Sequence, residues 1–354
     1  MRNFEIEPTG VYASPLIRPP GMDTKVPYEP MLESHNKFFD WVTVTAIKTW
    51  YGSPFQTWPG KIVDKVRGGK QDVITGTPGA PLPDPLDARK VAVFGDMGEG
   101  SPAQTRSAAL ALKWGPSYVA TVGDNVYPLG REVDWARRFD PQFAELRRTA
   151  IWRPALGNHD YYSGDLRPYF NRFPNTAGQA YYTWKLDQAE FFVLDTEQRL
   201  DDKSAQRAWL ERQLAASTAP YRVIQMHRPM LSTNGGGIAR NLYGSLGPLI
   251  AKYGVQLVLA GHEHGYERSR DVDGTTYMVV GGGGATTIPY VFKLPGSSLV
   301  RTARNHHLEL AFDAGRMVVR AVDDRGEAFD TMTVLPHAAV AGAVAGVAAL
   351  TRAA

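Results

Sequence analysis

Five polar groups with side chains that metal ions prefer follow five apolar segments, each at the point where its segment ends. The groups are Gly95-Asp96-Met97-Gly98, Gly123-Asp124-Asn125-Val126-Tyr127, Gly157-Asn158-His159-Asp160, His227 and Gly261-His262-Glu263-His264. Ligands of open α/β sheets collect in the crevice outside the carboxyl ends of the strands. If the five segments share one sheet, we expect these side chains to meet at one edge.

Taken singly, each group has an ordinary structural explanation. A Gly-Asp pair after a strand is typical of a turn in which the Asp side chain bonds to nearby backbone. A lone histidine such as His227 is more often a structural residue than a ligand. His262 and His264 are more specific, because alternate side chains of an extended segment face the same side. The turn explanation must be invoked separately five times, so a shared site is the better hypothesis.

The combined donor set suits a pair of metal ions. It comprises two carboxylates, an amide, a phenol and four imidazoles, from Asp96, Asp124, Asn158, Tyr127, His159, His227, His262 and His264. Two ions about 3.5–4 Å apart stabilise both the attacking and the leaving oxygen of a phosphoryl transfer. Two carboxylates and a deprotonated phenol do not neutralise the roughly five charges of a trivalent–divalent pair, so the site would attract a phosphate dianion.

Composition excludes several other functions. The 354 residues include 39 Lys and Arg against 36 Asp and Glu, and the net charge of +3 does not indicate binding to nucleic acid or to an anionic membrane surface. The chain has no cysteine, which rules out thiol nucleophiles, disulfides, zinc ribbons and iron–sulfur clusters. Any metal must therefore be bound by imidazole, carboxylate, amide or phenol groups. We expect a small phosphorylated substrate, and the oligomeric state stays open.

Strand and helix signals alternate over most of the chain. Expected strands cover 90–94, 118–122, 191–194, 222–226 and 255–259, and expected helices cover 102–114, 132–148, 203–216 and 244–253. After the glycine run 281–284 the pattern changes to strands alone, at 307–312, 317–322 and 329–334. This order predicts an α/β core that gains antiparallel strands, as two stacked sheets. The glycine run lacks P-loop spacing, and we attribute it to close backbone packing.

Composition divides the chain into three parts. Residues 1–88 hold 12 of the 25 prolines, and we expect a loop-rich extension that packs on the core, with one strand at 42–51. Residues 89–335 form the expected catalytic domain, and 336–354 form an Ala/Gly-rich tail. Its uncharged run, 338–350, is too short to cross a bilayer, which takes about 20 residues. Because the N-terminus shows no secretory signal, we expect a cytoplasmic protein.

In this order, the five groups resemble the signature of the calcineurin-like metallophosphoesterases and, within them, of the purple acid phosphatases. The resemblance covers roughly residues 90–335, and the segment LAGHEHGYERS at 259–269 is similar to the last block of the plant-type enzymes. Most of the superfamily begins with Asp-x-His, but here Gly98 stands in place of that His. Tyr127 occupies the position at which purple acid phosphatases have a phenolate ligand.

The resemblance implies an αββα sandwich, in which two stacked mixed β-sheets are flanked by helices. It also implies a dinuclear phosphatase that hydrolyses phosphomonoesters through a metal-bound hydroxide. A ferric ion would be bound by Asp96, Asp124, Tyr127 and His264, and a divalent ion (Zn²⁺, Mn²⁺ or Fe²⁺) by Asp124, Asn158, His227 and His262. His159 would face the substrate as a catalytic imidazole, and Asp160 would orient it.

Several assignments stay open. Purple acid phosphatases commonly have another substrate-facing His nine residues after the counterpart of His227, where this chain has Gly236. A di-zinc centre, a phosphodiester substrate and a non-catalytic binding protein are the alternatives. Arg228 and Arg268 either attract phosphate or form salt bridges. Structural roles are the default for the remaining candidates: a strand-end hydrogen bond for Asp195, and packing or solvent exposure for His35, His306, His307 and His337.

Overall fold

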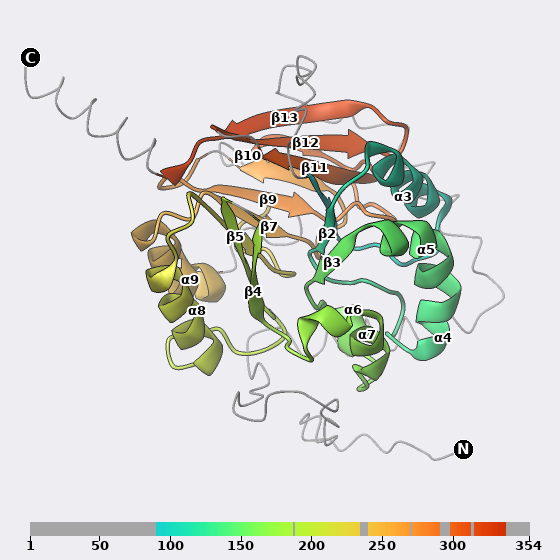
Figure 1. Ribbon diagram of the computed structural model, residues 1–354, viewed down its shortest axis with the longest axis horizontal. Helices are drawn as coiled ribbons and strands as arrows, with labels where there is room; N and C mark the ends of the chain where they lie inside the picture. Colours follow the sequence, from blue (N-terminus) through green and yellow to red (C-terminus); the bar gives the residue numbers. More distant parts are fainter. Residues whose placement is uncertain are drawn as a thin grey trace, which may run out of the picture.

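The computed structural model describes residues 90–186, 188–233, 240–269, 271–290, 298–312 and 315–337. The expected extension 1–88 lies outside these ranges with its strand and with His35, as do Gly236 and the tail beyond 337. Within them, the chain forms two β-sheets that stack face to face and carry helices on their outer sides (Figure 1). The predicted αββα sandwich of two mixed sheets is confirmed.

The first sheet contains the strands that precede the first three polar groups. They are β1 (Lys90–Phe94), β2 (Tyr118–Thr121), β3 (Ile151–Pro154), β11 (His306–Phe312), β12 (Met317–Asp323) and β13 (Ala328–Val334), in the spatial order β13-β12-β11-β1-β2-β3. β1, β2 and β3 run parallel, whereas β11 joins β1 antiparallel. Residues on both faces of β1 are buried, which explains its continuous apolar sequence.

The second sheet contains the strands that precede the two histidine groups. Its strands are β4 (Tyr182–Leu186), β5 (Ala189–Val193), β6 (Tyr221–Gln225), β7 (Leu257–Ala260), β8 (Tyr266–Ser269), β9 (Thr276–Val280) and β10 (Ser298–Thr302), in the order β10-β8-β9-β7-β6-β5-β4. β5, β6, β7 and β9 run parallel. The sequence pattern does not predict β4, β8, β9 and β10.

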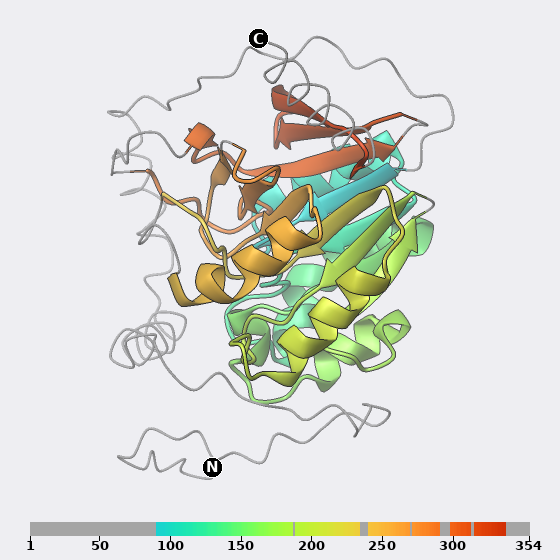
Figure 2. The ribbon, with the colours of Figure 1, turned by 90° about the vertical axis from the view of Figure 1, so that its left-hand side faces the viewer.

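Helices cover the outer face of each sheet. α3 (Pro102–Trp114), α4 (Glu132–Asp134), α5 (Asp140–Thr149) and α7 (Arg167–Arg172) lie on the side of the first sheet, and α6 (Asn158–Tyr161) follows β3. α8 (Ala205–Ala216) and α9 (Arg240–Lys252) cover the second sheet and are nearest the viewer in Figure 2. Three apolar clusters result, one between the sheets and one under each helical layer. The interior is therefore apolar, and the polar groups lie at the strand ends.

The expected helix 132–148 is interrupted. A π-helical turn, Trp135–Phe139, separates α4 from α5. Pro141, in the first turn of α5, has no N–H to donate to the preceding turn, and the wider turn buries both Trp135 and Phe139 completely. The amphipathic pattern therefore locates the helical region but not the local change in its hydrogen bonding.

The strands that carry the polar groups do not share one sheet, so the expectation of a single edge is wrong. β1, β2 and β3 belong to the first sheet, and β6 and β7 belong to the second. The sequence pattern indicates where strands lie but not which strands are neighbours. The strand ends of the two sheets nevertheless meet, because the N–H of His262, after β7, donates to the carboxylate of Asp96, after β1, over 2.8 Å.

Two histidines of β11 are buried, so packing and not solvent exposure is their role. His306 and His307 are both fully buried, whereas His337 is half-buried. The ring centroid of His306 lies 5.2 Å from that of Tyr266 and 5.9 Å from that of Phe329. Its Nδ1 faces the carbonyl oxygen of the residue two positions before it, at 2.9 Å. Burial lowers the pKa of His306 to about 4.

We predict that His306 lowers the stability of the protein at acid pH. The unfolded chain binds a proton at an ordinary pKa of 6.5 and the folded chain only near 4, so the unfolded state binds more protons between these values. Stability is therefore lost as the pH falls through this window, by about 3 kcal/mol at pH 4. Between pH 7 and pH 4, the free energy of unfolding measured with urea should fall by about this amount more in the wild type than in His306→Asn, whose side chain cannot be protonated. Parallel pH profiles of the two proteins would contradict the prediction.

Candidate metal centre

Asp96 and Asp124 lie in the loops directly after β1 and β2. Both have a left-handed backbone, with φ of 52° and 48°, so the chain turns sharply at each carboxylate. Both residues are buried, with 0% and 1% of their surface exposed. The N–H of Asp96 donates to the carbonyl oxygen of Gly123 over 3.1 Å, which holds the two loops side by side. Buried carboxylates are costly without partners, so these two require neighbouring donors or cations.

Tyr127 joins the two carboxylates to His264. Its hydroxyl oxygen lies 3.1 Å from Oδ1 of Asp96, 3.2 Å from Oδ2 of Asp124 and 3.0 Å from Nε2 of His264. Nδ1 of His264 faces the carbonyl oxygen of Thr286 at 2.9 Å, so Nε2 is turned toward the carboxylates. We call Asp96, Asp124, Tyr127 and His264 the tyrosine cluster. These are the residues that the resemblance assigns to the ferric ion, and the structure brings them together.

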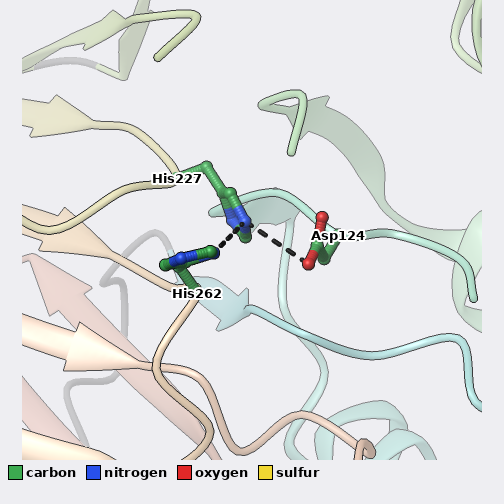
Figure 3. A group of neighbouring side chains, drawn as sticks. All are labelled: Asp124, His227 and His262. Carbon is green, nitrogen blue, oxygen red and sulfur yellow. Dashed lines mark hydrogen bonds and ion pairs between the residues drawn. The ribbon is translucent and has the colours of Figure 1, made fainter. Parts of the chain in front are cut away.

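A second group, which we call the asparagine cluster, consists of Asn158, His227 and His262. Oδ1 of Asn158 lies 3.0 Å from Nε2 of His227 and 3.0 Å from Nδ1 of His262. Nε2 of His227 is also 3.4 Å from Oδ2 of Asp124, and its Nδ1 faces the carbonyl oxygen of Val122 at 2.8 Å. One donor atom from each of Asp124, His227 and His262 lies within 4.8 Å of the others (Figure 3). Asp124 therefore contacts both clusters.

The clusters hold carboxylates, a phenol and imidazoles in contact, and only His262 and His264 are partly exposed. Burial raises the pKa of Asp124, but the imidazoles of His227, His159 and His262 together outweigh that effect and hold this pKa well below its usual range. Burial, followed by the carboxylates of Asp124 and Asp96, raises the pKa of Tyr127 well above 10. Although burial lowers the pKa of His227, Asp124 raises it to about 10. Negative charge collected in this way must be offset by cations, and the oxygen and nitrogen donors fit metal ions.

His159 lies beside the clusters. Its ring centroid is 4.3 Å from that of Tyr127 and 4.7 Å from that of Tyr162, and its Nε2 is 4.0 Å from Oδ2 of Asp124. Nδ1 faces the carbonyl oxygen of Pro128 at 2.8 Å. Because a carbonyl oxygen only accepts hydrogen bonds, Nδ1 carries the proton and Nε2 is the nitrogen next to the clusters.

Asp160 does not orient the His159 imidazole, contrary to what the resemblance implies. Its buried carboxylate accepts hydrogen bonds from the N–H of Gly157 at 2.9 Å and from the backbone and side-chain nitrogens of Asn125 at 3.1 and 2.9 Å. The physical reason is that adjacent side chains on a helical turn point in different directions. Asp160 therefore ties the loop after β2 to the start of α6, and the carbonyl of Pro128 holds the imidazole.

Asp195, which follows β5, fixes α6 from the opposite sheet. It is buried and accepts hydrogen bonds from the hydroxyl of Tyr161 and from the side chain of Gln198, the latter at 2.8 Å. This confirms the expected strand-end hydrogen bond. The sequence does not predict a role for Tyr161, Tyr162 or the carbonyl groups that orient the imidazoles. Adjacency to Asp160 is the only signal for the two tyrosines, and a backbone carbonyl leaves no signal in the residue type.

Both arginines that flank polar groups form salt bridges. Arg268 binds Asp330 through Nε at 2.6 Å and Nη2 at 2.8 Å, which is a structural contact. Arg228 binds Glu197 through Nε at 2.7 Å, and its Nη1 also lies 3.1 Å from Nε2 of His262. Of the two, Arg228 is therefore the arginine that reaches the candidate metal centre.

Comparison with known proteins identifies the family. A model described as calcineurin-like phosphoesterase matches residues 89–266. The chain belongs to this family. It is 28% identical over 204 residues to tartrate-resistant acid phosphatase type 5 of Homo sapiens, a match that covers 48% of this chain and 62% of that relative. It is 23% identical over 322 residues to the probable inactive purple acid phosphatase 9 of Arabidopsis thaliana, over 69% of this chain and 49% of the relative.

The fold of this metallophosphoesterase is also that of a solved purple acid phosphatase from yellow lupin (Lupinus luteus) seeds. The TM-score is 0.65 at 20% identity, and the match covers 72% of this chain and 55% of the lupin chain. The predicted calcineurin-like metallophosphoesterase family is therefore confirmed, and the chain is similar to purple acid phosphatases, a family that implies a dinuclear metal site. In the described ranges, we find no helix with the length and apolar character needed to span a bilayer.

Gly98 leaves no room for the His that most of the superfamily has at this position. Its φ is 76°, and a Cβ there would lie 2.1 Å from the carbonyl oxygen of Asn125 and 2.5 Å from Cα of Val126. The carbonyl oxygen of Gly98 accepts the N–H of Tyr127 over 3.0 Å. The segment that carries Tyr127 therefore lies where a side chain at position 98 would stand.

The glycine run 281–284 packs against the loops after β1 and β7. A Cβ on Gly281 would lie 2.0 Å from the carbonyl oxygen of Glu263, and one on Gly283 would lie 2.5 Å from that of Gly95. Close backbone packing, the explanation that the sequence favours, is confirmed.

We predict that Gly98→Ala destabilises the protein more than Gly115→Ala. Gly115 has a similar φ of 73°, but nothing lies within 4 Å of a Cβ added to it. The left-handed conformation alone costs about 1–2 kcal/mol, and the overlap at Gly98 adds about 1–3 kcal/mol. Chemical denaturation of both variants measures the difference. Equal losses of stability would contradict the steric exclusion at position 98.

Proposed function

We propose that this metallophosphoesterase hydrolyses phosphomonoesters at a dinuclear metal centre. The observation that carries the proposal is the position of Asp124, whose Oδ2 lies 3.2 Å from the hydroxyl of Tyr127 in one cluster and 3.4 Å from Nε2 of His227 in the other. A carboxylate placed between two donor clusters is suited to bridge two cations. The acid phosphatase relative supports the substrate class.

The donors of the two clusters suit different ions. The tyrosine cluster would hold Fe³⁺, because two carboxylates and a phenol favour a hard trivalent cation, and the asparagine cluster would hold Zn²⁺, Mn²⁺ or Fe²⁺ through an amide oxygen and imidazoles. A di-zinc centre is the alternative. When bound, the two ions would lower the pKa of a water molecule and offset the charge of the phosphoryl group.

His159 would supply the proton that the leaving oxygen needs. Its Nδ1 is held by the carbonyl oxygen of Pro128 at 2.8 Å, which fixes the ring and leaves Nε2 to carry and donate a proton. The packing of its ring against Tyr127 and Tyr162 keeps that nitrogen next to the clusters. Proton transfer by a positioned imidazole contributes about 10²–10⁴-fold to the rate. Asp160 and Asp195 would act indirectly, by holding the backbone of α6.

A non-catalytic role is the second candidate. The observation that favours it is the name of the Arabidopsis thaliana relative, a probable inactive enzyme whose match covers 69% of this chain. The contacts of the two clusters support catalysis instead, because each of the seven proposed ligands has a donor atom within 3.5 Å of another. A protein that had lost catalysis would not need to keep these costly buried groups together.

The proposal is tested by comparing two rates of hydrolysis, that of the monoester p-nitrophenyl phosphate and that of the diester bis-p-nitrophenyl phosphate. The protein used has a known metal content. We expect the monoester to react faster, chelation to abolish the reaction, and reloading with iron and a divalent ion to restore it. His159→Ala should keep the metal content and lose about 10²–10⁴-fold in kcat. Faster hydrolysis of the diester would indicate a phosphodiesterase. If protein with two bound ions cleaves no ester in a broad panel of phosphate esters, the phosphatase function is wrong and the non-catalytic role replaces it.

Tyr127→Phe tests the iron assignment. A phenolate bound to Fe³⁺ gives a charge-transfer band that colours the protein violet, and the variant loses the hydroxyl but keeps the ring that packs 4.3 Å from His159. The iron-loaded wild type should show the band in its visible spectrum and the variant should not, with elemental analysis of both samples as the control. An iron-loaded wild type without the band would exclude phenolate ligation.

A further inference from the structure

Arg228 is held in a fixed orientation beside the asparagine cluster. Its side chain is 14% exposed. Nε and Nη2 of its guanidinium form a double salt bridge with the carboxylate of Glu197, at 2.7 and 2.9 Å. Its backbone N–H donates to the hydroxyl oxygen of Thr196 over 3.0 Å. A guanidinium bound in this forked way loses its freedom to rotate, so the direction of its third nitrogen is fixed.

The third nitrogen, Nη1, points at His262. It lies 3.1 Å from Nε2 of that imidazole, whose Nδ1 faces the asparagine cluster, 3.0 Å from Oδ1 of Asn158 and 3.3 Å from Nε2 of His227. A guanidinium has donors only, so the contact is a hydrogen bond only while Nε2 of His262 accepts. The contact therefore requires that the ring proton sits on Nδ1, the nitrogen that faces the proposed cation.

Binding of a cation at Nδ1 of His262 removes this hydrogen bond. The neutral imidazole has one N–H, so a ring that binds a cation through Nδ1 carries its proton on Nε2. Nε2 and Nη1 of Arg228 are then both donors, and Nη1 needs a new acceptor. Glu197 does not provide one, because it lies at the Nε and Nη2 edge of the planar guanidinium and Nη1 is directed away from that edge. The new acceptor must come from outside this group of side chains.

We propose that Nη1 of Arg228 binds an oxygen of the substrate's phosphoryl group when the asparagine cluster holds its cation. The guanidinium is charged at any pH in the working range, and it forms short, charge-assisted hydrogen bonds with phosphate oxygens. Glu197 holds the guanidinium in place without occupying Nη1. Arg268 is paired with Asp330 through the same two nitrogens, but in the described residues no hydrogen bond of its guanidinium reaches a residue of either cluster, so it has no such role. The inference rests on the proposed function, because it requires a metal-loaded centre and a phosphate ester.

Binding of inorganic phosphate to the metal-loaded protein, measured by calorimetry, tests the inference. Loss of one charge-assisted hydrogen bond should weaken phosphate binding about 10- to 100-fold in Arg228→Met. Arg228→Lys keeps the charge and should retain part of the affinity. KM for p-nitrophenyl phosphate should rise with the Kd of phosphate, while the metal content stays at the wild-type value. Arg207→Met removes an arginine of similar exposure, 18%, from α8 and should behave as the wild type.

A double variant distinguishes loss of the contact between Nη1 of Arg228 and phosphate from repulsion of phosphate by the carboxylate of Glu197. Removing Arg228 alone leaves the carboxylate of Glu197 without its partner, and that charge would itself repel phosphate. Arg228→Met combined with Glu197→Gln removes both members of the pair and leaves the net charge unchanged. We expect this double variant to bind phosphate as weakly as Arg228→Met. Wild-type affinity in the double variant would overturn the inference, because repulsion by Glu197 would then explain the single variant.

Two further outcomes would also overturn the inference while leaving the proposed function intact. One is unchanged phosphate affinity in an Arg228→Met protein that still hydrolyses the monoester. The other is loss of metal from Arg228→Met, which would make Arg228 a support of the metal ligands instead. A metal-loaded wild type that neither binds phosphate nor cleaves any ester would overturn the proposed function as well.

Discussion

The buried carboxylate of Asp124 is the group that most constrains which segments of this structure must lie together. It takes contacts from the hydroxyl of Tyr127, from the ring of His227 and from the backbone N–H of His159. Moving a carboxylate out of water costs several kcal/mol, which only close partners or cations offset. Its partners come from the segments after β2, β3 and β6, so these segments must lie within hydrogen-bond distance of one another. The candidate metal centre is therefore a product of how the two sheets meet.

Polar contacts between the sheets keep that arrangement in register. Asp96 accepts from the N–H of His262, and Asp195 accepts from the hydroxyl of Tyr161 in α6. Each contact joins a residue that follows a strand of one sheet to a residue that follows a strand of the other. The apolar cluster between the sheets provides most of the adhesion but little direction, since the hydrophobic effect is not directional. The hydrogen bonds supply the direction, and they hold the donor atoms in place.

The parts of the fold and site that the sequence predicts are those encoded by local residue types. Continuous apolar runs identify β1 and β7, and a Pro in the first turn marks the start of α3. The five polar groups are found because metal-binding side chains follow five separate apolar segments of the same chain.

The parts that the sequence does not predict depend on contacts between distant segments. The division of the strands between two sheets is one such feature. The acceptors for His159 and His264 are backbone carbonyl groups of Pro128 and Thr286, which any residue type provides. Asp160 is adjacent to His159 in the chain, but the turn of α6 directs its carboxylate to Gly157 and Asn125. Adjacency in sequence is therefore a poor guide to which side chain orients an imidazole.

The exchange of a His for a Tyr shows how backbone packing determines the chemistry proposed for the centre. A side chain at position 98 and the segment 125–127 compete for the same space, because a Cβ on Gly98 would overlap the backbone of Asn125 and Val126. With Gly98 in place, the N–H of Tyr127 reaches the Gly98 carbonyl oxygen, and the phenol reaches both carboxylates. The tyrosine cluster thereby gains an acidic oxygen that a histidine would not provide. An acidic oxygen favours a trivalent cation over a divalent one, so the difference between the two proposed ions follows from the contact between two loops.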